Sequence, residues 1–232
     1  MQDLCNNHRW YRRKQSVVGS GTQGIIYQAC RQQQKLNSKC QFVVKESSSG
    51  SSTAYDELAA NLGIGPNVFI EQCNDKIYLI QERLDGTLLS LLESSKTINE
   101  KDLKSLSHLI YDSIDNMNIF HNDLHAENVM YKIMGKDKKF YLIDFSTAQP
   151  INSTGFKQFD RKLAQHSFIR INDKFIMVLS PAQIEELKSK HRPTVQQTQQ
   201  EIQKEKERIR KINVAKQIAA KQLELRMKKF KK

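Results

Sequence analysis

Three polar side chains in the middle of the chain have the types and the order that metal-assisted transfer of a phosphate group requires. Asp123 and Asn128 lie five residues apart in the polar segment 121–128, and Asp144 follows an apolar run. Phosphoryl transfer needs one carboxylate to orient the attacking hydroxyl. It also needs an amide oxygen and a second carboxylate to hold magnesium against the phosphates. Asp123 could orient the hydroxyl, and Asn128 and Asp144 could bind the metal.

The same segment also suggests a zinc site, because His121 and His125 are four residues apart. That spacing places both imidazoles on one face only if the segment is helical. The glutamate that follows the first histidine in the zinc-protease pattern is absent. We therefore expect His121 to brace the loop.

A glycine cluster near the N-terminus could hold the phosphates. Gly19-x-Gly21-x-x-Gly24 fits either a dinucleotide fingerprint or a phosphate-binding hairpin, and glycines also gather in ordinary turns. A dinucleotide site needs a helix after the glycines, whereas residues 25–27 continue as a strand. The sequence therefore favours a hairpin folded over phosphates.

A lysine and a glutamate could complete this site. Lys45 ends an apolar run, which predicts a position at the edge of a sheet, beneath the glycines. Glu57 lies on a helix predicted by the four-residue spacing of apolar residues over 54–62. Its carboxylate could hold the Lys45 ammonium by ion pairing, with Asp56 as the competing acid. Each of these residues, taken alone, is more often an ordinary surface group.

These residues need a sheet on one side and helices on the other. The first 84 residues alternate β-prone runs with turns, which predicts a mainly antiparallel sheet interrupted by the helix over 54–62. A capping box at Thr97 and Glu100 predicts the start of a long helix before the polar loop. Its apolar face is marked by Leu103, Leu106, Ile110, Ile114 and Met117.

Most of the formal charge of +12 on this 232-residue chain lies at its C-terminal end. The segment 182–232 holds 15 Lys and Arg against 6 Asp and Glu, and its composition predicts helix. Such an arm could bind nucleic acid, an acidic membrane surface or an acidic protein partner. It could equally be a solvated helix packed partly on the body. A partial seven-residue spacing permits a coiled coil without requiring one.

Other features predict an intracellular protein. No apolar run of about 18 residues predicts a membrane span, and no apolar signal segment follows Met1. The four cysteines have no metal-site or redox-motif spacing, so we expect reduced thiols at Cys5, Cys30, Cys40 and Cys73. We expect a cytoplasmic location, with a nuclear or virion-associated location as the alternatives.

The order and spacing of these features resemble the protein-kinase superfamily over roughly residues 16–150; the features are the glycine cluster, Lys45, Glu57, Asp123, Asn128 and Asp144. The resemblance implies a two-lobe α/β (α+β) fold that binds ATP and Mg²⁺ in its cleft. It implies an antiparallel N-lobe with one helix over 1–84 and a reduced, mainly helical C-lobe over 85–180. A basic helical extension would occupy 181–232.

The resemblance also implies a role for each residue. Asp123 would be the catalytic base, Lys45 would bind the α- and β-phosphates, and Glu57 would pair with Lys45. Asn128 and Asp144 would bind magnesium. The nucleotide-binding set would be Gly19, Ser20, Gly21, Gly24, Ile26, Lys45, Gln81, Glu82 and Leu84, of which the last three would form the hinge that meets adenine.

Departures from the family pattern make the chain similar to compact atypical kinases such as the KEOPS-complex kinase, haspin-like kinases and small viral kinases. Asn122 replaces the usual arginine, which predicts no control by activation-loop phosphorylation. His125 and Ser146 replace a lysine and a glycine, and no Ala-Pro-Glu follows Asp144. These departures leave the peptide-binding platform unassigned. Asp160 could brace the shortened lobe.

Three functions are compatible with this sequence. The leading hypothesis is a minimal serine/threonine protein kinase acting on a protein hydroxyl. A small-molecule kinase of the aminoglycoside or choline type shares the Asp-x-x-x-x-Asn and the later Asp, but the early glycine loop and compact second lobe favour the first hypothesis. A pseudokinase is the third, and the filled catalytic positions argue against it.

Overall fold

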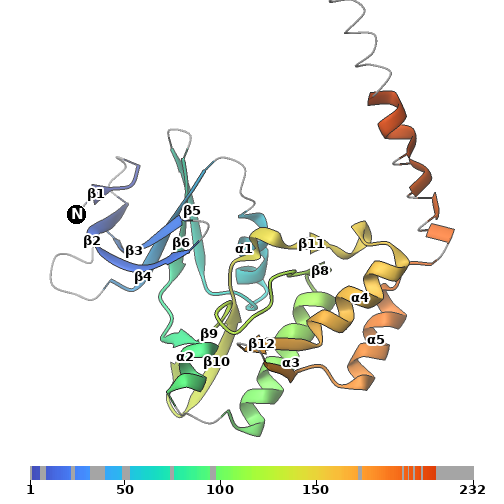
Figure 1. Cartoon of the computed structure of the whole chain (residues 1–232). Coiled ribbons are helices and arrows are strands. Elements are labelled where there is room, and N and C mark those ends of the chain that lie inside the picture. Colours follow the sequence, from blue (N-terminus) through green and yellow to red (C-terminus); the bar gives the residue numbers. More distant parts are fainter. Residues whose placement is uncertain are drawn as a thin grey trace, which may run out of the picture.

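The computed structural model forms two lobes joined through residues 83–85 (Figure 1). It describes residues 2–5, 9–21, 24–31, 40–48, 53–73, 76–94, 98–171, 174–194, 196–197, 199–200, 202–204 and 206–212. The sheet lobe contains β1 (Gln2–Asp3), β2 (Trp10–Gly21), β3 (Gly24–Arg31), β4 (Phe42–Ser48), α1 (Ala54–Asn61), β5 (Val68–Cys73) and β6 (Lys76–Glu82).

The helical lobe follows. It contains β7 (Gly86–Thr87), α2 (Leu88–Glu93), α3 (Glu100–Asp115), β8 (Ile119–Phe120), β9 (Val129–Met134), β10 (Asp137–Leu142), η1 (Phe145–Thr147), β11 (Gln149–Pro150), η2 (Ile151–Ser153), α4 (Phe156–His166), β12 (Phe168–Ile171), β13 (Lys174–Met177) and α5 (Pro181–His191). The predicted α+β fold, an antiparallel sheet with one helix followed by helices, is confirmed. The division at residues 84 and 180 stays a prediction.

Six antiparallel strands form the sheet in the order β1-β2-β3-β4-β6-β5. The register places Gly21 opposite Gly24 at the end of the β2–β3 hairpin, and Lys45 opposite Ile26 on one side and Leu79 on the other. Lys45 therefore lies on an interior strand, which corrects the expected position at the sheet edge. An apolar run such as 42–44 suits a strand with neighbours on both sides.

The two faces of β4 have different surroundings, because successive side chains of a strand point to opposite faces. Val43 and Lys45 face the space between the lobes. Val44 lies in an apolar cluster on the other face, with Leu4, Trp10, Ala29, Tyr78 and Ile80. The N-terminal segment thus gives the sheet a small core of its own.

The cysteines are paired, which corrects the expectation of reduced thiols. Cys5 is bonded to Cys73, 68 residues away, and Cys30 is bonded to Cys40. Their Cα–Cα separations of 5.7 and 4.8 Å are ordinary for disulfides. Strand pairing brings these residues together, so their spacing along the chain gave no sign of it.

Helix α3 begins with a capping box two residues later than predicted. The Asn99 side chain accepts a hydrogen bond from the Asp102 N–H at 2.8 Å, and the Asp102 carboxylate accepts one from the Asn99 N–H at 3.3 Å. These two residues, not Thr97 and Glu100, therefore cap the helix, and Thr97 lies outside the described residues. Asparagine serves as well as threonine at this position because either side chain can accept the bond.

One large core holds the helical lobe together. Leu106, Ile110 and Ile114 of α3 are buried in it, as is Met117 beyond the helix, whereas Leu103 is exposed. Strands β9 and β10 pair antiparallel over Val129–Met134 and Asp137–Leu142. The polar segment 121–128 is thus held between a buried helix and a buried hairpin.

The basic segment begins as a packed helix. Leu187 of α5 is fully buried, and the His191 imidazole lies 2.9 Å from the Asp115 carboxylate. Just beyond α5, Arg192 pairs with Asp160 at 2.5 Å. Asp160, expected to brace the lobe, therefore anchors α5.

The described residues between 196 and 212 are mostly helical and run away from both lobes (Figure 1). The rest of the predicted basic extension, 213–232, lies outside the described residues. No helix within the described part of the chain is long and apolar enough to cross a membrane.

Candidate active site

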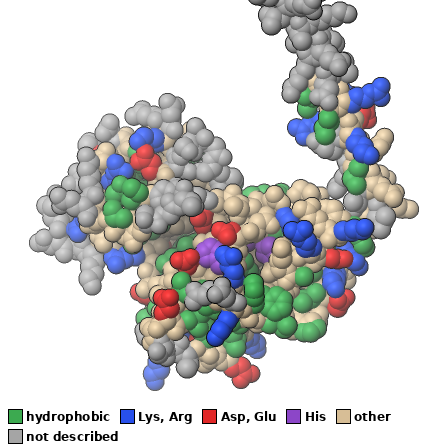
Figure 2. Space-filling view, viewed as in Figure 1, with side chains coloured by type: hydrophobic (Ala, Val, Ile, Leu, Met, Phe, Trp, Pro, Cys, Tyr) green, Lys and Arg blue, Asp and Glu red, His purple; other side chains and the backbone are tan. Residues whose placement is uncertain are grey.

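A cleft of about 650 Å³ opens between the sheet lobe and the loop that carries Asp123. Figure 2 shows acidic and histidine side chains gathered where the two lobes meet. Nine predicted site residues line this cleft: Gly19, Ile26, Lys45, Gln81, Glu82, Leu84, Asp123, Asn128 and Asp144. Glu57 is absent from the lining.

The β2–β3 hairpin forms the upper wall of the cleft. Ser20 and Gly21 end β2 and Gly24 begins β3, while residues 22–23 at the tip lie outside the described part. A Cβ placed on Gly19 would meet only the Ile26 side chain, at 4.0 Å. Packing within the protein therefore does not require glycine here. The absence of a side chain keeps room for a ligand to approach the backbone.

The loop residues Asp123 and Asn128 are bonded to each other. The Asn128 amide nitrogen donates to the backbone carbonyl of Asp123 at 2.9 Å and to its carboxylate at 3.2 Å. Asn128 is 8 % exposed, whereas the Asp123 side chain is half-exposed. Because the amide nitrogen faces Asp123, the amide oxygen is the atom that can bind a cation, and Asp123 stays open to an incoming hydroxyl.

Asp144 has a left-handed backbone, with φ of 61°. A non-glycine residue in this region stores about 1–2 kcal/mol of strain, and such strain often marks a functional position. Both oxygens of its carboxylate lie 3.4 Å from the Lys45 ammonium. The unusual backbone therefore turns the carboxylate towards the interior strand of the sheet lobe.

Helix α1 presents Asp56, rather than Glu57, to this pair, which corrects the predicted partner of Lys45. Asp56 is 6 % exposed, while Glu57 is exposed to solvent. Burial and the nearby Asp144 carboxylate raise the pKa of Asp56 to about 6, against the opposing effects of Lys45 and a hydrogen bond from the Phe145 backbone. Asp56 is therefore the α1 carboxylate that senses both Lys45 and Asp144.

The predicted helix face explains this error. Leu58 and Leu62, taken as the buried face, are 37 % and 46 % exposed, whereas Ala59 is fully buried. Adjacent helical residues differ by about 100° around the axis, so choosing the wrong face also chooses the wrong acid.

His121 joins the two segments that carry Asp123 and Asp144. It is buried, its Nε2–H donates to the Ile143 carbonyl at 2.9 Å, and its ring packs 4.8 Å from that of Phe145. Burial lowers the pKa of this imidazole. A neutral His121 thus ties the segment before Asp123 to the residue before Asp144, which agrees with the expected bracing role.

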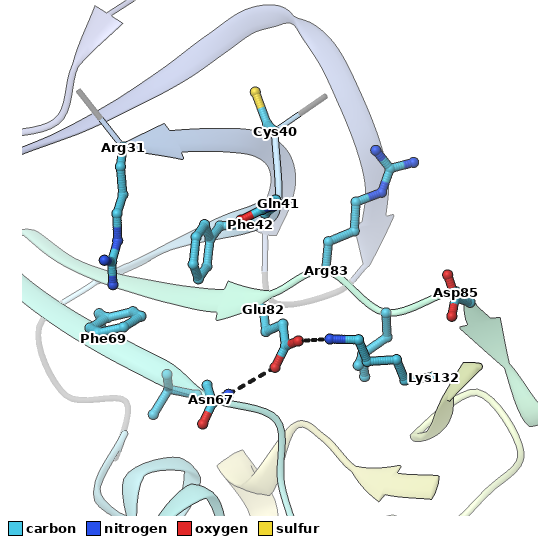
Figure 3. Close-up of a pocket in the computed structure, with 12 residues that line it drawn as sticks. Arg31, Cys40, Gln41, Phe42, Asn67, Phe69, Glu82, Arg83, Asp85 and Lys132 are labelled. Carbon is cyan, nitrogen blue, oxygen red and sulfur yellow. Dashed lines mark hydrogen bonds and ion pairs between the residues drawn. The ribbon is translucent and has the colours of Figure 1, made fainter. Parts of the chain in front are cut away.

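The Glu82 side chain, at the end of β6 just before the segment that joins the lobes, borders both the cleft and a second hollow. Glu82 borders the cleft, but its carboxylate bonds to Lys132 and, at 2.9 Å, to Asn67 (Figure 3). These partners border a second hollow of about 800 Å³ behind the hinge, where Arg31 lies against Phe69 (Figure 3). That hollow is larger but holds none of Lys45, Asp123, Asn128 and Asp144. At the hinge, Glu82 can therefore meet a ligand only through its backbone.

Two further residues near Asp123 were not predicted as site residues. The His125 Nε2 lies 3.6 Å from the Asp123 carboxylate, and its Nδ1 lies 3.6 Å from the Glu127 carboxylate. His166 of α4 is buried behind the loop and bonds to Asn122. His125 was singled out by its place in the loop, whereas no pattern in the sequence marks His166, 44 residues from its partner.

The donor set fits magnesium. Among the described residues, no group of three or more His, Cys, Asp and Glu forms a metal cluster. Magnesium in phosphate-transfer sites is held by one or two carboxylates, with phosphate and water oxygens completing its octahedron. The Asp144 carboxylate and the Asn128 amide oxygen are the residues that would hold it.

Comparison with known families agrees with this geometry. The model of the protein kinase domain matches residues 12–164, about two thirds of the chain, and no curated protein matches it. The matched range contains the β2–β3 hairpin, Lys45, Asp123, Asn128 and Asp144, which contribute to the lining of the cleft. The chain belongs to the protein kinase domain family.

Proposed function

We propose that this protein is an active, compact serine/threonine protein kinase of atypical type, which uses ATP and Mg²⁺. The observation that carries the proposal is the meeting of Lys45, Asp123, Asn128 and Asp144 in one cleft beneath the glycine hairpin. Three acid or amide oxygens and one ammonium are the groups that a phosphoryl transfer needs, and they come from both lobes.

In this proposal each side chain performs one task. The glycine hairpin, with Gly19, Ser20, Gly21, Gly24 and Ile26, would cover the nucleotide, and Gln81, Glu82 and Leu84 would meet its base. Lys45 would exchange its contact with Asp144 for phosphate oxygens, with Asp56 in the place expected for Glu57. Magnesium, when bound, neutralises the phosphate charge. Asp123 would accept the proton of the acceptor hydroxyl, which it can reach because its carboxylate is half-exposed.

The surface beside Asp123 favours a protein acceptor over a small molecule. Strand β12 joins the catalytic loop through a 2.9 Å hydrogen bond from the Ala126 N–H to the Arg170 carbonyl. The β12–β13 hairpin exposes Phe175 (65 %) and Met177 (58 %) to solvent. An open apolar surface next to the base suits a polypeptide better than the enclosed pocket that a small acceptor needs.

The test is phosphate transfer from γ-labelled ATP with Mg²⁺, using wild type and Asp123→Ala. Acceptors are casein, histone, an aminoglycoside and choline. We expect label on serine or threonine of a protein acceptor, with a rate about 10²–10⁴-fold lower for Asp123→Ala at unchanged melting temperature. Transfer only to a small molecule would favour the second kinase class. Binding of ATP without any transfer by wild type would point to a pseudokinase.

The partners of the basic extension and the location are further proposals. We infer an acidic partner, nucleic acid or acidic membrane surface for the extension, since beyond Thr194 it holds 12 Lys and Arg against 4 Asp and Glu.

An intracellular location stays a prediction, although disulfides are rare in reducing compartments. Thiol alkylation of freshly lysed cells would measure how far the four cysteines are oxidised in place.

A further inference from the structure

The last residue of α4, His166, is a buried titratable group with no place in the cleft. It is 4 % exposed, and its ring lies 5.0 Å from the ring of Phe120 on β8. Strand β8 leads directly into the loop that carries Asp123. His166 therefore supports the loop from behind, on the side away from the nucleotide.

Its two ring nitrogens make hydrogen bonds of opposite kinds. The backbone N–H of Asn122 donates to Nε2 at 3.0 Å, and Nδ1 lies 2.8 Å from the Lys162 carbonyl. Since an amide can only donate and a carbonyl can only accept, His166 must be neutral, with its proton on Nδ1. Burial agrees with this state, because it lowers the pKa of His166 to about 4.

The residue held by His166 has a strained backbone. Asn122 has φ of 62°, and its side-chain amide donates to the Thr147 carbonyl at 2.9 Å. The Thr147 hydroxyl in turn donates to the His121 carbonyl at 3.0 Å. Asn122 is thus fixed at its backbone by α4 and at its side chain by η1, the turn that follows Asp144. The positions of Asp123 and Asp144 are coupled through this residue.

We propose that His166 is a positioning residue for catalysis: by accepting the Asn122 N–H, it holds the left-handed turn that aims Asp123 into the cleft. The inference rests on the proposed kinase activity. The expected bracing acid, Asp160, does not hold this turn: its Oδ2 pairs with Arg192, and the Asn122 N–H donates to His166 instead. A neutral imidazole accepts the bond without placing a charge in the core, which a carboxylate in the same position would do.

The closest test replaces His166 by phenylalanine, which keeps an aromatic ring beside Phe120 and removes the acceptor. We expect kcat to fall about 10- to 100-fold, since the Asn122 N–H loses its buried partner, while KM for ATP stays within about twofold. His166→Gln keeps an acceptor oxygen and should recover part of the loss. His191→Phe is the matched control: it removes a histidine bond on α5, far from the loop, and should leave kcat unchanged.

A second measurement does not depend on activity. Hydrogen exchange of the Asn122 amide should be about tenfold faster or more in His166→Phe than in wild type, with exchange in α3 unchanged. If wild type transfers no phosphate, the proposed function fails while this exchange still tests the hydrogen bond. If His166→Phe does not fold, His166→Leu, which also lacks an acceptor, decides by the same exchange and the same ratio of kcat to KM. A wild-type kcat together with an unchanged Asn122 amide, in whichever of these two variants folds, would overturn the proposal.

Discussion

The sheet lobe buries six apolar residues in its own cluster and carries two disulfides, whereas the helical lobe shares one continuous core of 24 residues, counted over the described residues. Two of those 24, Ala59 and Ile64, come from α1 and the segment after it. The helix that carries Asp56 therefore packs with the helical lobe. Asp123, Asn128 and Asp144 rest on the large core, while Lys45 and the glycine hairpin rest on the small one.

The two lobes therefore differ in rigidity. The groups that orient a hydroxyl and a metal must keep their geometry to within a fraction of an ångström. A hairpin that covers a nucleotide must open and close around it, which a lobe with few buried contacts allows. The disulfides then limit unfolding of the small lobe without stiffening the hairpin itself.

Removing a buried side chain from the large core should cause the largest change in the free energy of unfolding. Phe159 of α4 is fully buried against Phe120, with ring centres 5.6 Å apart. Phe159→Ala should lower the free energy of unfolding by about 3–5 kcal/mol, measured by urea unfolding. Phe175→Ala removes the same side chain from an exposed position and should change stability by less than about 0.5 kcal/mol. Equal losses in the two variants would mean that α4 is not part of the core.

Removing a disulfide should destabilise the sheet lobe more than the helical lobe. For a loop of 68 residues, the chain-entropy estimate for Cys5–Cys73 is about 4 kcal/mol. The variant with both residues changed to serine should lose that stability in the sheet lobe first. Hydrogen exchange should accelerate in β2 and β5 and stay unchanged in α3. The control is Cys30→Ser with Cys40→Ser, which opens a loop of only 10 residues and should cost about 3 kcal/mol. Uniform acceleration over both lobes would contradict the division described above.

Acid should act on His166 and Asp56 in opposite directions. His166 has a folded pKa of about 4, below its ordinary value of 6.5, so the unfolded chain binds the proton first and stability falls as the pH drops from 6.5 to 4. Asp56 has a folded pKa of about 6, above its ordinary value of 3.8, so its carboxyl favours the folded state as the pH drops from 6 to 3.8. Each effect is on the order of 3 kcal/mol, and they largely cancel in the wild type.

Asp56→Asn should remove the effect of Asp56 on the pH dependence of stability and leave that of His166. The variant should be about 2 kcal/mol more stable than wild type at pH 7, because a buried carboxylate is removed, and should lose stability more steeply between pH 6.5 and 4.5. Its kcat should fall about tenfold or more, since Lys45 loses a partner. The neighbouring Glu57→Gln is the matched control and should leave stability and kcat unchanged. Loss of activity in Glu57→Gln alone would restore the original prediction.

Removing the basic extension should have the smallest effect on the lobes. A chain ending at Thr194 keeps α5 and the Arg192–Asp160 pair, so we expect kcat and melting temperature to stay within error of wild type. Retention on heparin and on phosphatidylserine vesicles should be lost, and glutamine at the lysines of 204–211 should weaken it partly. Unchanged retention would place the polyanion-binding surface on the lobes.

The sequence predicted those parts of the site that depend on short local patterns. Asp123, Asn128 and Asp144 were predicted from short polar segments and Gly19 from one hairpin, and the structure places these four residues in one cleft. Their roles stay predictions. The prediction of Glu57 instead of Asp56 was wrong because adjacent helical residues point about 100° apart, so the choice depends on which face of α1 is buried. Helix faces are read from apolar side chains, and Leu58 of α1 and Leu62 just beyond it are both exposed.

Long-range pairings could not be read from the sequence. The bond between Cys5 and Cys73 depends on the strand register, and the bond between Asn122 and His166 depends on how α4 packs behind β8. Histidine has no preferred sequence neighbour for such a role, and a solitary one gives no periodicity. Both are properties of the assembled core.

The burial of Phe145 has a consequence for the design of inhibitors. This residue is 1 % exposed, packs beside the His121 ring and begins the turn that follows Asp144. A compound that occupies the Phe145 pocket must first move a phenylalanine into water, which costs about 1.5–3 kcal/mol. That cost alone weakens its apparent affinity by about 10- to 100-fold. Compounds that fill only the nucleotide cleft avoid this penalty, so screening libraries for this protein should be weighted towards them.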